Sequence, residues 1–238
     1  MKNINDLRIK IFSDGADKEN MLEMAKKPFV QGLTTNPTLM RKAGVRDYEE
    51  FCRSVLDEIK EKPISFEVFS DDFSEMERQA RKIASWGRNV YVKIPISNTK
   101  GIPSYDLIKR LSSDGISLNV TAIFTLQQVE AVVNVIEDSV PNFVSVFAGR
   151  IADTGIDPLP IMKSALSILK SNSSSELIWA SPRELLNIIQ GDEIGCHIIT
   201  VTSDILRKLE YLGYPLDDFS LDTVKMFFDD AQNAGFAL

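Results

Sequence analysis

The sequence predicts an α/β protein that folds as a single (β/α)8 (TIM) barrel over residues 1–238, with an extra C-terminal helix. Three observations predict this class: short apolar runs recur about eight times, helical stretches separate them, and nearly every run ends in polar residues. An open, doubly wound sheet also fits this alternation. The glycine-rich turn that follows the first strand of a dinucleotide-binding sheet is missing after Asp14, so the barrel is favoured.

The expected strands are rich in Val, Ile and Phe, which suit strands buried on both faces of a parallel sheet. In chain order they are residues 8–14, 29–35, 64–69, 90–95, 117–124, 143–149, 176–181 and 197–201. The segments between them have helical periodicity; in residues 71–87 an apolar stripe lies opposite a charged face. Residues 220–238 predict one more amphipathic helix, which either caps the barrel or crosses to another subunit.

Composition excludes several classes of function. The formal net charge is −7, and an acidic chain without a basic cluster is poorly suited to binding nucleic acid. No apolar run approaches the roughly 20 residues that span a bilayer, and the N-terminus lacks the apolar core of a signal peptide. Because Cys52 and Cys196 lie far apart and there is one histidine, we expect a cytoplasmic protein with no metal, no other cofactor and no membrane partner.

A lysine interrupts the apolar stretch VYVKIPIS, residues 90–97. A lysine is rarely buried without a partner, so Lys93 either lies on a wet strand face or is held there to react. Most other expected strands carry polar residues at corresponding places: Asp14, Thr34 to Asn36, Glu67, Asn119, Thr121, Ser145 and Ser181. Since the active sites of barrels gather at the carboxyl ends of the strands, this recurrence predicts a polar cluster at one mouth of the barrel.

Such a cluster suits covalent chemistry at the lysine. Burial disfavours the charged form of a lysine, and a neutral amine can form a Schiff base with a carbonyl substrate. Asp14 and Glu67 are the candidates for the proton transfers that this chemistry needs. Arg150 and Arg183 each follow a late strand, where each could grip a phosphate group or form a surface ion pair.

The single histidine, His197, follows Cys196 at the start of the last expected strand. Chemistry at Lys93 does not require a histidine. We therefore interpret His197 as a core residue with satisfied hydrogen bonds rather than a catalytic group.

Five segments in order resemble signatures of the transaldolase family, whose members are class I Schiff-base enzymes on a (β/α)8 barrel. The segments are GLTTNPTLM (32–40), YVKIPISNTKG (91–101), LNVTAIFT (118–125), VSVFAGRIADTG (144–155) and WASPRELLNI (179–188). The resemblance runs almost end to end. The length is similar to that of the compact subfamily, which also contains fructose-6-phosphate aldolases.

The resemblance implies a role for each matching residue. Lys93 would be the Schiff-base lysine, and Asp14 would be the acid/base that handles the donor hydroxyl during carbon–carbon cleavage. Glu67 and Thr121 would position the catalytic water. The substrate contacts it implies are Asn36 and Asn119 at the donor hydroxyls with Thr34 and Ser145 near them, and Arg150, Arg183 and Ser181 at the sugar phosphate.

Two positions separate transfer from simple cleavage. The related aldolases tend to carry glutamine at the position of Glu67 and tyrosine at that of Phe147. The resemblance therefore implies a transaldolase of the pentose phosphate type, which moves a dihydroxyacetone unit from fructose 6-phosphate or sedoheptulose 7-phosphate to an aldose phosphate. The alternatives are an aldolase that releases free dihydroxyacetone and a non-catalytic barrel that binds sugar phosphates. The resemblance also implies a homo-oligomer.

Overall fold

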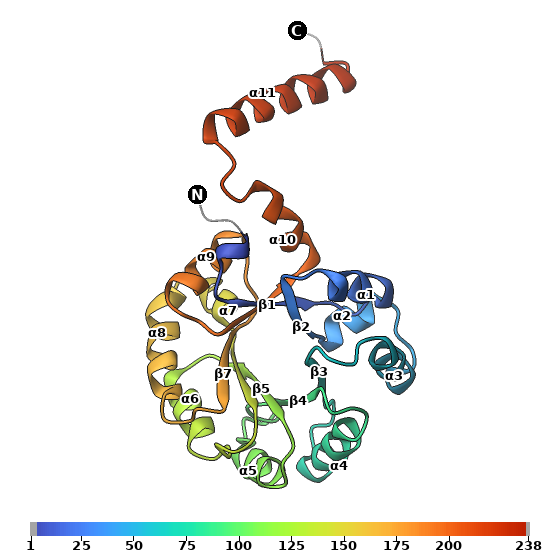
Figure 1. The fold of residues 1–238 in the computed structure, drawn as a ribbon, viewed down its shortest axis with the longest axis vertical. Coiled ribbons are helices and arrows are strands. Elements are labelled where there is room, and N and C mark those ends of the chain that lie inside the picture. The colour runs from blue at the N-terminus through green and yellow to red at the C-terminus, as the bar shows by residue number, and fades with distance from the viewer. Residues whose placement is uncertain (1–3, 237–238) are drawn as a thin grey trace.

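Within residues 4–236, the part of the chain that the computed structural model describes, eight parallel strands close into a barrel (Figure 1). The predicted fold class is therefore confirmed; the ends of the expected 1–238 range, residues 1–3 and 237–238, lie outside the described part. Each strand pairs with the next in chain order, and β8 pairs with β1. The strands are β1 (Lys10–Asp14), β2 (Val30–Thr34), β3 (Ile64–Glu67), β4 (Val90–Pro95), β5 (Leu118–Ile123), β6 (Asn142–Val146), β7 (Ser175–Trp179) and β8 (Ile198–Thr202).

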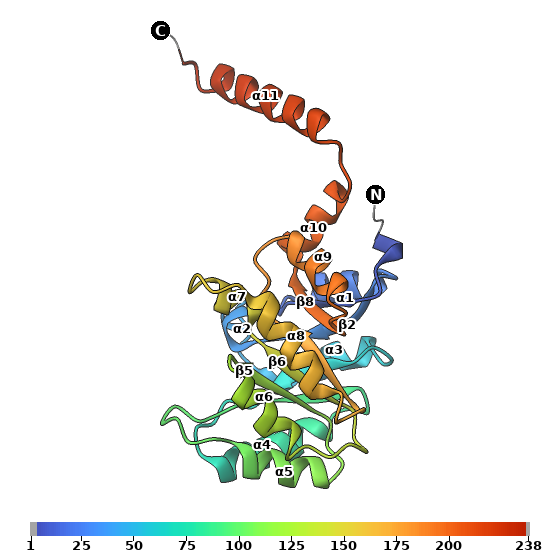
Figure 2. The same ribbon diagram turned by 90° about the vertical axis from the view of Figure 1, so that its left-hand side faces the viewer.

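Helices follow the strands and surround the barrel (Figures 1 and 2). In α4 the side chain of the N-cap residue Asp72 accepts a hydrogen bond from the Glu75 N–H. Met76 and Ile83 belong to the apolar stripe of this helix and are buried in the core. The α-helices are α1 (Lys18–Lys26), α2 (Pro37–Lys42), α3 (Tyr48–Glu58), α4 (Phe73–Ala84), α5 (Tyr105–Ser113), α6 (Leu126–Val133), α7 (Ala148–Ala152), α8 (Pro158–Leu169), α9 (Leu186–Glu193), α10 (Ser203–Arg207) and α11 (Leu216–Asn233). Short 3-10 helices are η1 (Ile4–Asp6) and η2 (Lys208–Tyr211).

Apolar side chains fill the space between the strands and the helices, and a smaller apolar group fills part of the barrel interior. In the interior group the ring of Tyr91 stacks on Phe143 with centroids 4.0 Å apart, and Phe12 meets Phe143 edge to face. A Cβ atom at Gly32 would lie 2.5 Å from the Phe12 ring, so glycine is what lets this ring enter the barrel. This apolar group leaves the carboxyl ends of the strands for polar side chains.

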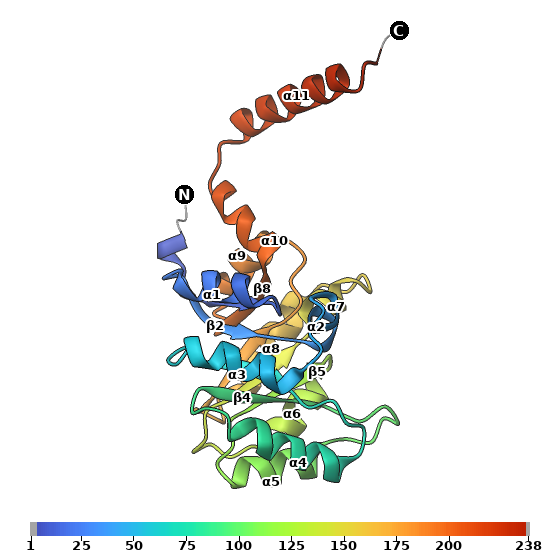
Figure 3. The same cartoon turned by 90° about the vertical axis from the view of Figure 1, so that its right-hand side faces the viewer.

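The last helix, α11, projects away from the barrel in each of the three ribbon views (Figures 1, 2 and 3). It covers most of the helix expected over residues 220–238, but it does not cap the barrel, and none of its residues is buried. Its exposed large apolar side chains are Leu216, Phe219, Leu221, Val224, Met226, Phe227 and Phe228. Across residues 4–236, α11 included, no helix combines the length and apolar character needed to cross a membrane.

Candidate active site

A cavity of about 640 Å³ opens at the carboxyl ends of the strands. Each residue that the sequence nominated for the site contributes to its lining: Asp14, Thr34, Asn36, Glu67, Lys93, Asn119, Thr121, Ser145, Phe147, Arg150, Ser181 and Arg183. These residues are far apart in the chain and meet because parallel strands end at the same edge of the sheet. The structure thus brings the nominated residues together, while their roles remain predictions.

Lys93 reaches this cavity because residues in β4 alternate between the two faces of the barrel wall. Val92 and Ile94 are fully buried, whereas the Lys93 side chain lies on the other face and is only 11% exposed. Its Nζ atom donates a hydrogen bond to the Thr35 carbonyl oxygen and lies 3.9 Å from the Glu67 Oε2 atom. The amine is therefore nearly dry, faces the cavity and has one carboxyl group within reach.

Asp14 ends β1 and is held by two neutral donors from the end of β2. The Thr34 hydroxyl donates to Asp14 Oδ1 at 2.7 Å, and Asn36 Nδ2 donates to Oδ2 at 3.2 Å. Burial raises the pKa of Asp14 above its ordinary range, and the nearby Lys93 charge opposes this rise only in part. A carboxyl group whose pKa is raised can hold or release a proton closer to neutral pH.

Glu67 ends β3 and is the second carboxyl group of the cavity. Its Oε2 accepts a hydrogen bond from the Thr35 hydroxyl at 3.0 Å, while Oε1 is buried without a partner in the described part of the chain. Burial raises its pKa, and the charge of Lys93 again works in the opposite direction. Because buried acceptors are nearly always paired, this oxygen gives Glu67 an unfilled hydrogen-bonding position.

Tyr48, on α3, fixes the backbone of Glu67. Its hydroxyl donates to the Glu67 carbonyl oxygen at 2.8 Å and accepts from the Glu67 N–H at 2.9 Å. Both backbone groups at the end of β3 are therefore satisfied by one side chain from outside the barrel. The carboxylate is positioned by an element that sequence reasoning did not connect with the site.

A chain of hydrogen bonds joins β6, β5 and β3 beside Lys93, because Asn119 is the register partner of Lys93. Ser145 donates to Asn119 Oδ1 at 2.7 Å, and Asn119 Nδ2 donates to the Ser65 hydroxyl at 3.0 Å. Next to them Thr121 lies where β5 is irregular: Ala122 has a positive φ of 60°, and the register with β6 shifts there. This kink turns the end of β5 into the cavity rim.

Arg150, on α7, and Arg183, in the loop after β7, both lie at the rim because α7 and this loop approach each other closely. A Cβ atom at Gly149 would lie 1.5 Å from the Ser181 carbonyl oxygen, so only glycine lets α7 approach this loop. Arg150 places its guanidinium 5.5 Å from the Phe147 ring centroid. Ser181 itself has a positive φ of 57°.

The two arginines differ in their pairing. Arg183 forms a bidentate ion pair with Asp153, and Arg183 in turn holds the pKa of Asp153 below its usual range. Arg150 makes no ion pair within residues 4–236. Arg183 therefore forms the surface ion pair that the sequence left open as the alternative to phosphate binding. Arg150 is free to bind an anion.

Sequence reasoning gave several residues of the site no role. Thr35 supplies the hydroxyl bound to Glu67 and the carbonyl bound to Lys93, and Thr200 and Thr202 line the cavity from β8. Thr34 and Thr200 also share a hydrogen bond across the mouth. The available signal was that Thr200 and Thr202 alternate with Val201, the pattern of a strand with one polar face, although the last expected strand stopped at residue 201.

Fold and cavity together define the class: a (β/α)8 barrel whose carboxyl-terminal mouth holds a lysine and the carboxyl groups of Asp14 and Glu67. The model of the Transaldolase/Fructose-6-phosphate aldolase family matches residues 11–238, and the chain belongs to this family. It is an enzyme of the transaldolase or aldolase type. The family expectation drawn from the five sequence segments is confirmed.

Named relatives agree with this family. A probable transaldolase of Dehalococcoides mccartyi is 34% identical over 211 residues, which are 88% of this chain and 93% of the relative. A probable transaldolase of Thermoanaerobacter sp. is 32% identical over 231 residues, which are 97% of this chain and 100% of the relative. Among solved structures, KGPDC from Streptococcus mutans is similar with a TM-score of 0.56 at 9% identity, over 83% of this chain and 89% of KGPDC. That likeness shows the fold alone.

Proposed function

We propose that the protein is a transaldolase that carries a dihydroxyacetone unit on Lys93 as a Schiff base. The observation that carries the proposal is the Lys93 amine at the mouth of the barrel with two carboxyl groups near it: Glu67 Oε2 lies at 3.9 Å, and Asp14 is close enough for the lysine charge to act on its pKa. A structural ion pair would need one carboxylate. Two carboxyl groups with raised pKa values around one amine are suited to moving protons to and from it.

The first half of the reaction follows from these positions. Once it has lost a proton, the amine of Lys93 attacks the C2 carbonyl carbon of fructose 6-phosphate or sedoheptulose 7-phosphate, and loss of water gives a protonated imine. A water at the unpartnered Glu67 Oε1, also reached by Thr121, passes protons to the leaving oxygen. Asp14 then accepts the proton of the C4 hydroxyl while the C3–C4 bond breaks. C4 leaves as the carbonyl carbon of an aldehyde, glyceraldehyde 3-phosphate when fructose 6-phosphate is the donor, and the electron pair of the broken bond forms the enamine on Lys93.

The second half reverses this chemistry on another aldehyde. The enamine carbon attacks the carbonyl carbon of an aldose phosphate such as erythrose 4-phosphate, and Asp14 returns its proton to the new hydroxyl. Water then releases the product from Lys93. Asn36 and Asn119, with Thr34 and Ser145, hold donor hydroxyls along the walls, while Arg150, Ser181 and Arg183 take the phosphate at the rim.

The alternative is an aldolase that releases free dihydroxyacetone. Releasing it requires a proton for the enamine carbon after the aldehyde product has left. At the position where a hydroxyl could help to supply that proton, this chain has Phe147, whose ring packs under Arg150 and carries no donor. Glu67 and Phe147 therefore favour transfer over release.

The deciding assay measures glyceraldehyde 3-phosphate release from fructose 6-phosphate, with and without erythrose 4-phosphate. Sustained release only with the acceptor is the expected result. Equal release without the acceptor would make the protein an aldolase. Borohydride with fructose 6-phosphate should leave a mass adduct on a peptide containing Lys93 and none on the Lys93→Met variant; no adduct on the unmodified protein would overturn the Schiff-base proposal and leave a non-catalytic sugar-phosphate binder.

We also propose that the protein is a cytoplasmic homo-oligomer in which α11 packs against another subunit. The apolar side chains of α11 are exposed on the single chain, and the cost of hydrating them is removed if a second copy covers them. Cys52 and Cys196 are buried and unpaired, which suits a reducing compartment. Sedimentation of the full chain and of a chain ending at residue 214 tests the assembly: the full chain should be larger than a monomer and the shortened chain should not.

A further inference from the structure

Strands β2 and β3 stop pairing where they reach the candidate active site. The register pairs Thr34 with Ser65, and the Thr35 N–H still donates to the Ser65 carbonyl oxygen at 3.2 Å. A parallel ladder continued by one step would add two bonds: from the Glu67 N–H to the Thr35 carbonyl, and from the N–H of residue 37 to the Glu67 carbonyl. Other groups take the place of both bonds, for two different reasons.

The first reason is that residue 37 is a proline. Pro37 has no N–H to donate, and it begins α2 with Asn36 as the N-cap. The second reason is that the Thr35 carbonyl already accepts a hydrogen bond from Lys93 Nζ. The backbone N–H and carbonyl of Glu67 therefore both need partners from elsewhere in the fold.

Tyr48 supplies both partners through one hydroxyl. This hydroxyl donates to the Glu67 carbonyl at 2.8 Å and accepts the Glu67 N–H at 2.9 Å. Burial raises the pKa of Tyr48, so the hydroxyl keeps its proton and remains a donor. The Tyr48 ring meets Phe69 edge to face and Trp86 at a tilt, with centroids 5.2 and 6.1 Å away, and these contacts direct the hydroxyl between the strands. One side chain thus stands in for two backbone groups.

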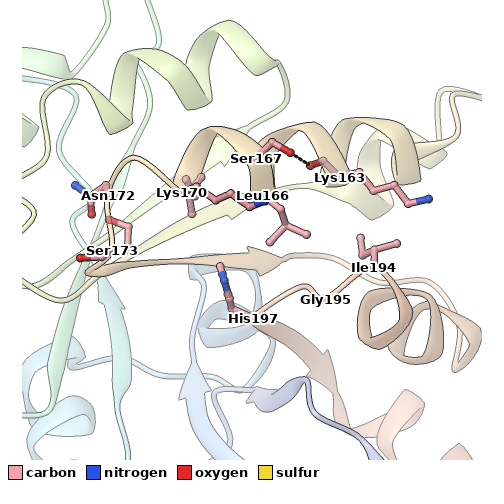
Figure 4. A pocket seen from close by; sticks show the side chains of 11 residues that line it. Lys163, Leu166, Ser167, Lys170, Asn172, Ser173, Ile194, Gly195 and His197 are labelled. Carbon is pink, nitrogen blue, oxygen red and sulfur yellow. Dashed lines mark hydrogen bonds between the residues drawn. The ribbon is translucent and has the colours of Figure 1, made fainter.

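A side chain that bonds the backbone of a strand is not by itself a sign of function. At the other end of the barrel, His197 (Figure 4) accepts the Leu177 N–H of β7 on its Nδ1 atom at 2.9 Å. His197 is half-buried and lies outside the lining of the candidate active site, so this contact fits the structural role expected from the sequence. Tyr48 differs because the backbone acceptor that it leaves available, the Thr35 carbonyl, binds the amine of Lys93.

We propose that Tyr48 is a positioning residue for the chemistry of Lys93: its hydroxyl satisfies the backbone of Glu67 and so leaves the Thr35 carbonyl to orient the lysine amine. This inference rests on the function proposed above. Tyr48 lies outside the cavity lining and acts only through the backbone of β3.

The consequence of losing the hydroxyl follows from the ladder. The buried Glu67 N–H would lack an acceptor, and the Thr35 carbonyl is the acceptor that the register places next to it. If the carbonyl turns to this N–H, Lys93 Nζ loses its one backbone anchor and keeps only Glu67 Oε2, at 3.9 Å. The amine would then be less well placed to attack the C2 carbon of the substrate.

Tyr48→Phe tests the proposal because it keeps the ring and removes the hydroxyl. Transfer from fructose 6-phosphate to erythrose 4-phosphate is measured with the full-length protein, and kcat is expressed per site that borohydride traps at Lys93. We expect kcat per trapped site to fall about tenfold, with KM for fructose 6-phosphate changed less than about twofold. A purely structural role would lower the number of trapped sites but not the rate of each, so an unchanged kcat per site would overturn the proposal.

The matched control is Tyr105→Phe, on α5. The Tyr105 hydroxyl forms no hydrogen bond among residues 4–236, so this variant should behave like the unmodified protein. An equal fall in both variants would contradict the role of Tyr48. The unmodified protein tests the underlying function: without a Lys93 adduct or transfer, both proposals fall, whereas normal adduct and transfer with an unaffected Tyr48→Phe variant remove only the positioning role.

A double variant separates the orientation of the amine from the stability of the fold. Pro37→Ala supplies the N–H that a continued ladder requires, so in combination with Tyr48→Phe it lets β2 and β3 pair by one more step. In urea unfolding, the double variant should regain stability relative to Tyr48→Phe. Its kcat per trapped site should stay low, because the completed ladder uses the Thr35 carbonyl. A return of kcat together with stability, or no gain in stability, would contradict the assigned contacts.

Discussion

In the candidate active site, the deep part and the rim of the cavity shift the pKa of a carboxyl group in opposite directions. In the deep part, the Lys93 and Glu67 side chains are 11% and 6% exposed, and burial raises the pKa of Glu67 despite the lysine. At the rim, Arg183 and Asp153 are about half exposed, and their direct pairing lowers the pKa of Asp153. Desolvation dominates in the deep part and pairing dominates at the rim. The deep part is thus suited to bond chemistry and the rim to binding.

The largest expected effect comes from the deep part. Lys93→Met removes the amine while keeping most of the buried volume, so transfer should fall at least about 10⁴-fold. Steady-state transfer assays and circular dichroism measure the loss and confirm that the fold is kept. Lys109→Met, on an outer helix, should match the unmodified protein. Retained transfer in Lys93→Met would refute covalent catalysis by this lysine.

Arg150 at the rim should affect binding rather than chemistry. Because Arg150 is unpaired and meets the phosphate in the proposed complex, Arg150→Ala should raise KM for fructose 6-phosphate by about tenfold or more and leave kcat nearly unchanged. Arg88→Ala, whose exposed ion pair with Glu61 lies outside the mouth, is the matched control. A fall in kcat at constant KM would mean that Arg150 acts in the chemical step, like the deep residues, and would contradict the division between a reactive deep part and a binding rim.

The raised pKa of Glu67 predicts how stability depends on pH. The folded state keeps the Glu67 proton to a higher pH than the unfolded chain does, so folding loses stability as pH rises above about 4, the range of an ordinary glutamate. Glu67→Gln cannot ionise and should be more stable than the unmodified protein at neutral pH, where the folded state of the unmodified protein must hold a buried charge. This advantage should shrink toward acid pH.

Urea unfolding at several pH values measures this difference. Glu130→Gln, on the exposed side of α6, should show no such trend. A stability difference for Glu67→Gln that is the same at pH 4 and pH 8 would show that burial does not control this carboxyl group.

The smallest effect concerns the ion pair at the rim. Asp153→Asn removes the charge that holds Arg183 and leaves the guanidinium free for a phosphate, so KM for fructose 6-phosphate should fall about two- to fivefold. The double variant with Arg183→Ala should lose this gain. An unchanged KM in Asp153→Asn would mean either that breaking the ion pair between Arg183 and Asp153 costs no free energy when substrate binds, or that Arg183 does not contact the phosphate.

Sequence reasoning reached the deep part more fully than the rim. Lys93, Asp14 and Glu67 stand out because each charged residue interrupts or ends an apolar strand, a pattern that periodicity reveals. Thr35 was given no role because its hydroxyl and its carbonyl act at residues that are distant in the chain. The pairing of Arg183 with Asp153 also joins two different loops, and no local pattern reports such a contact.

The sequence by itself determined the alternation of strands and helices, the barrel and the ends of the strands where polar residues collect. It could do so because the side-chain periods of strand and helix are local properties of the chain. The tertiary structure alone decided which atoms meet: the Lys93 amine at the Thr35 carbonyl, the Tyr48 hydroxyl at the Glu67 carbonyl and the Leu177 N–H at His197 Nδ1. It also decided that α11 leaves the barrel. These outcomes depend on three-dimensional packing between segments that are distant in sequence, and burial sets the protonation preferences only once that packing exists.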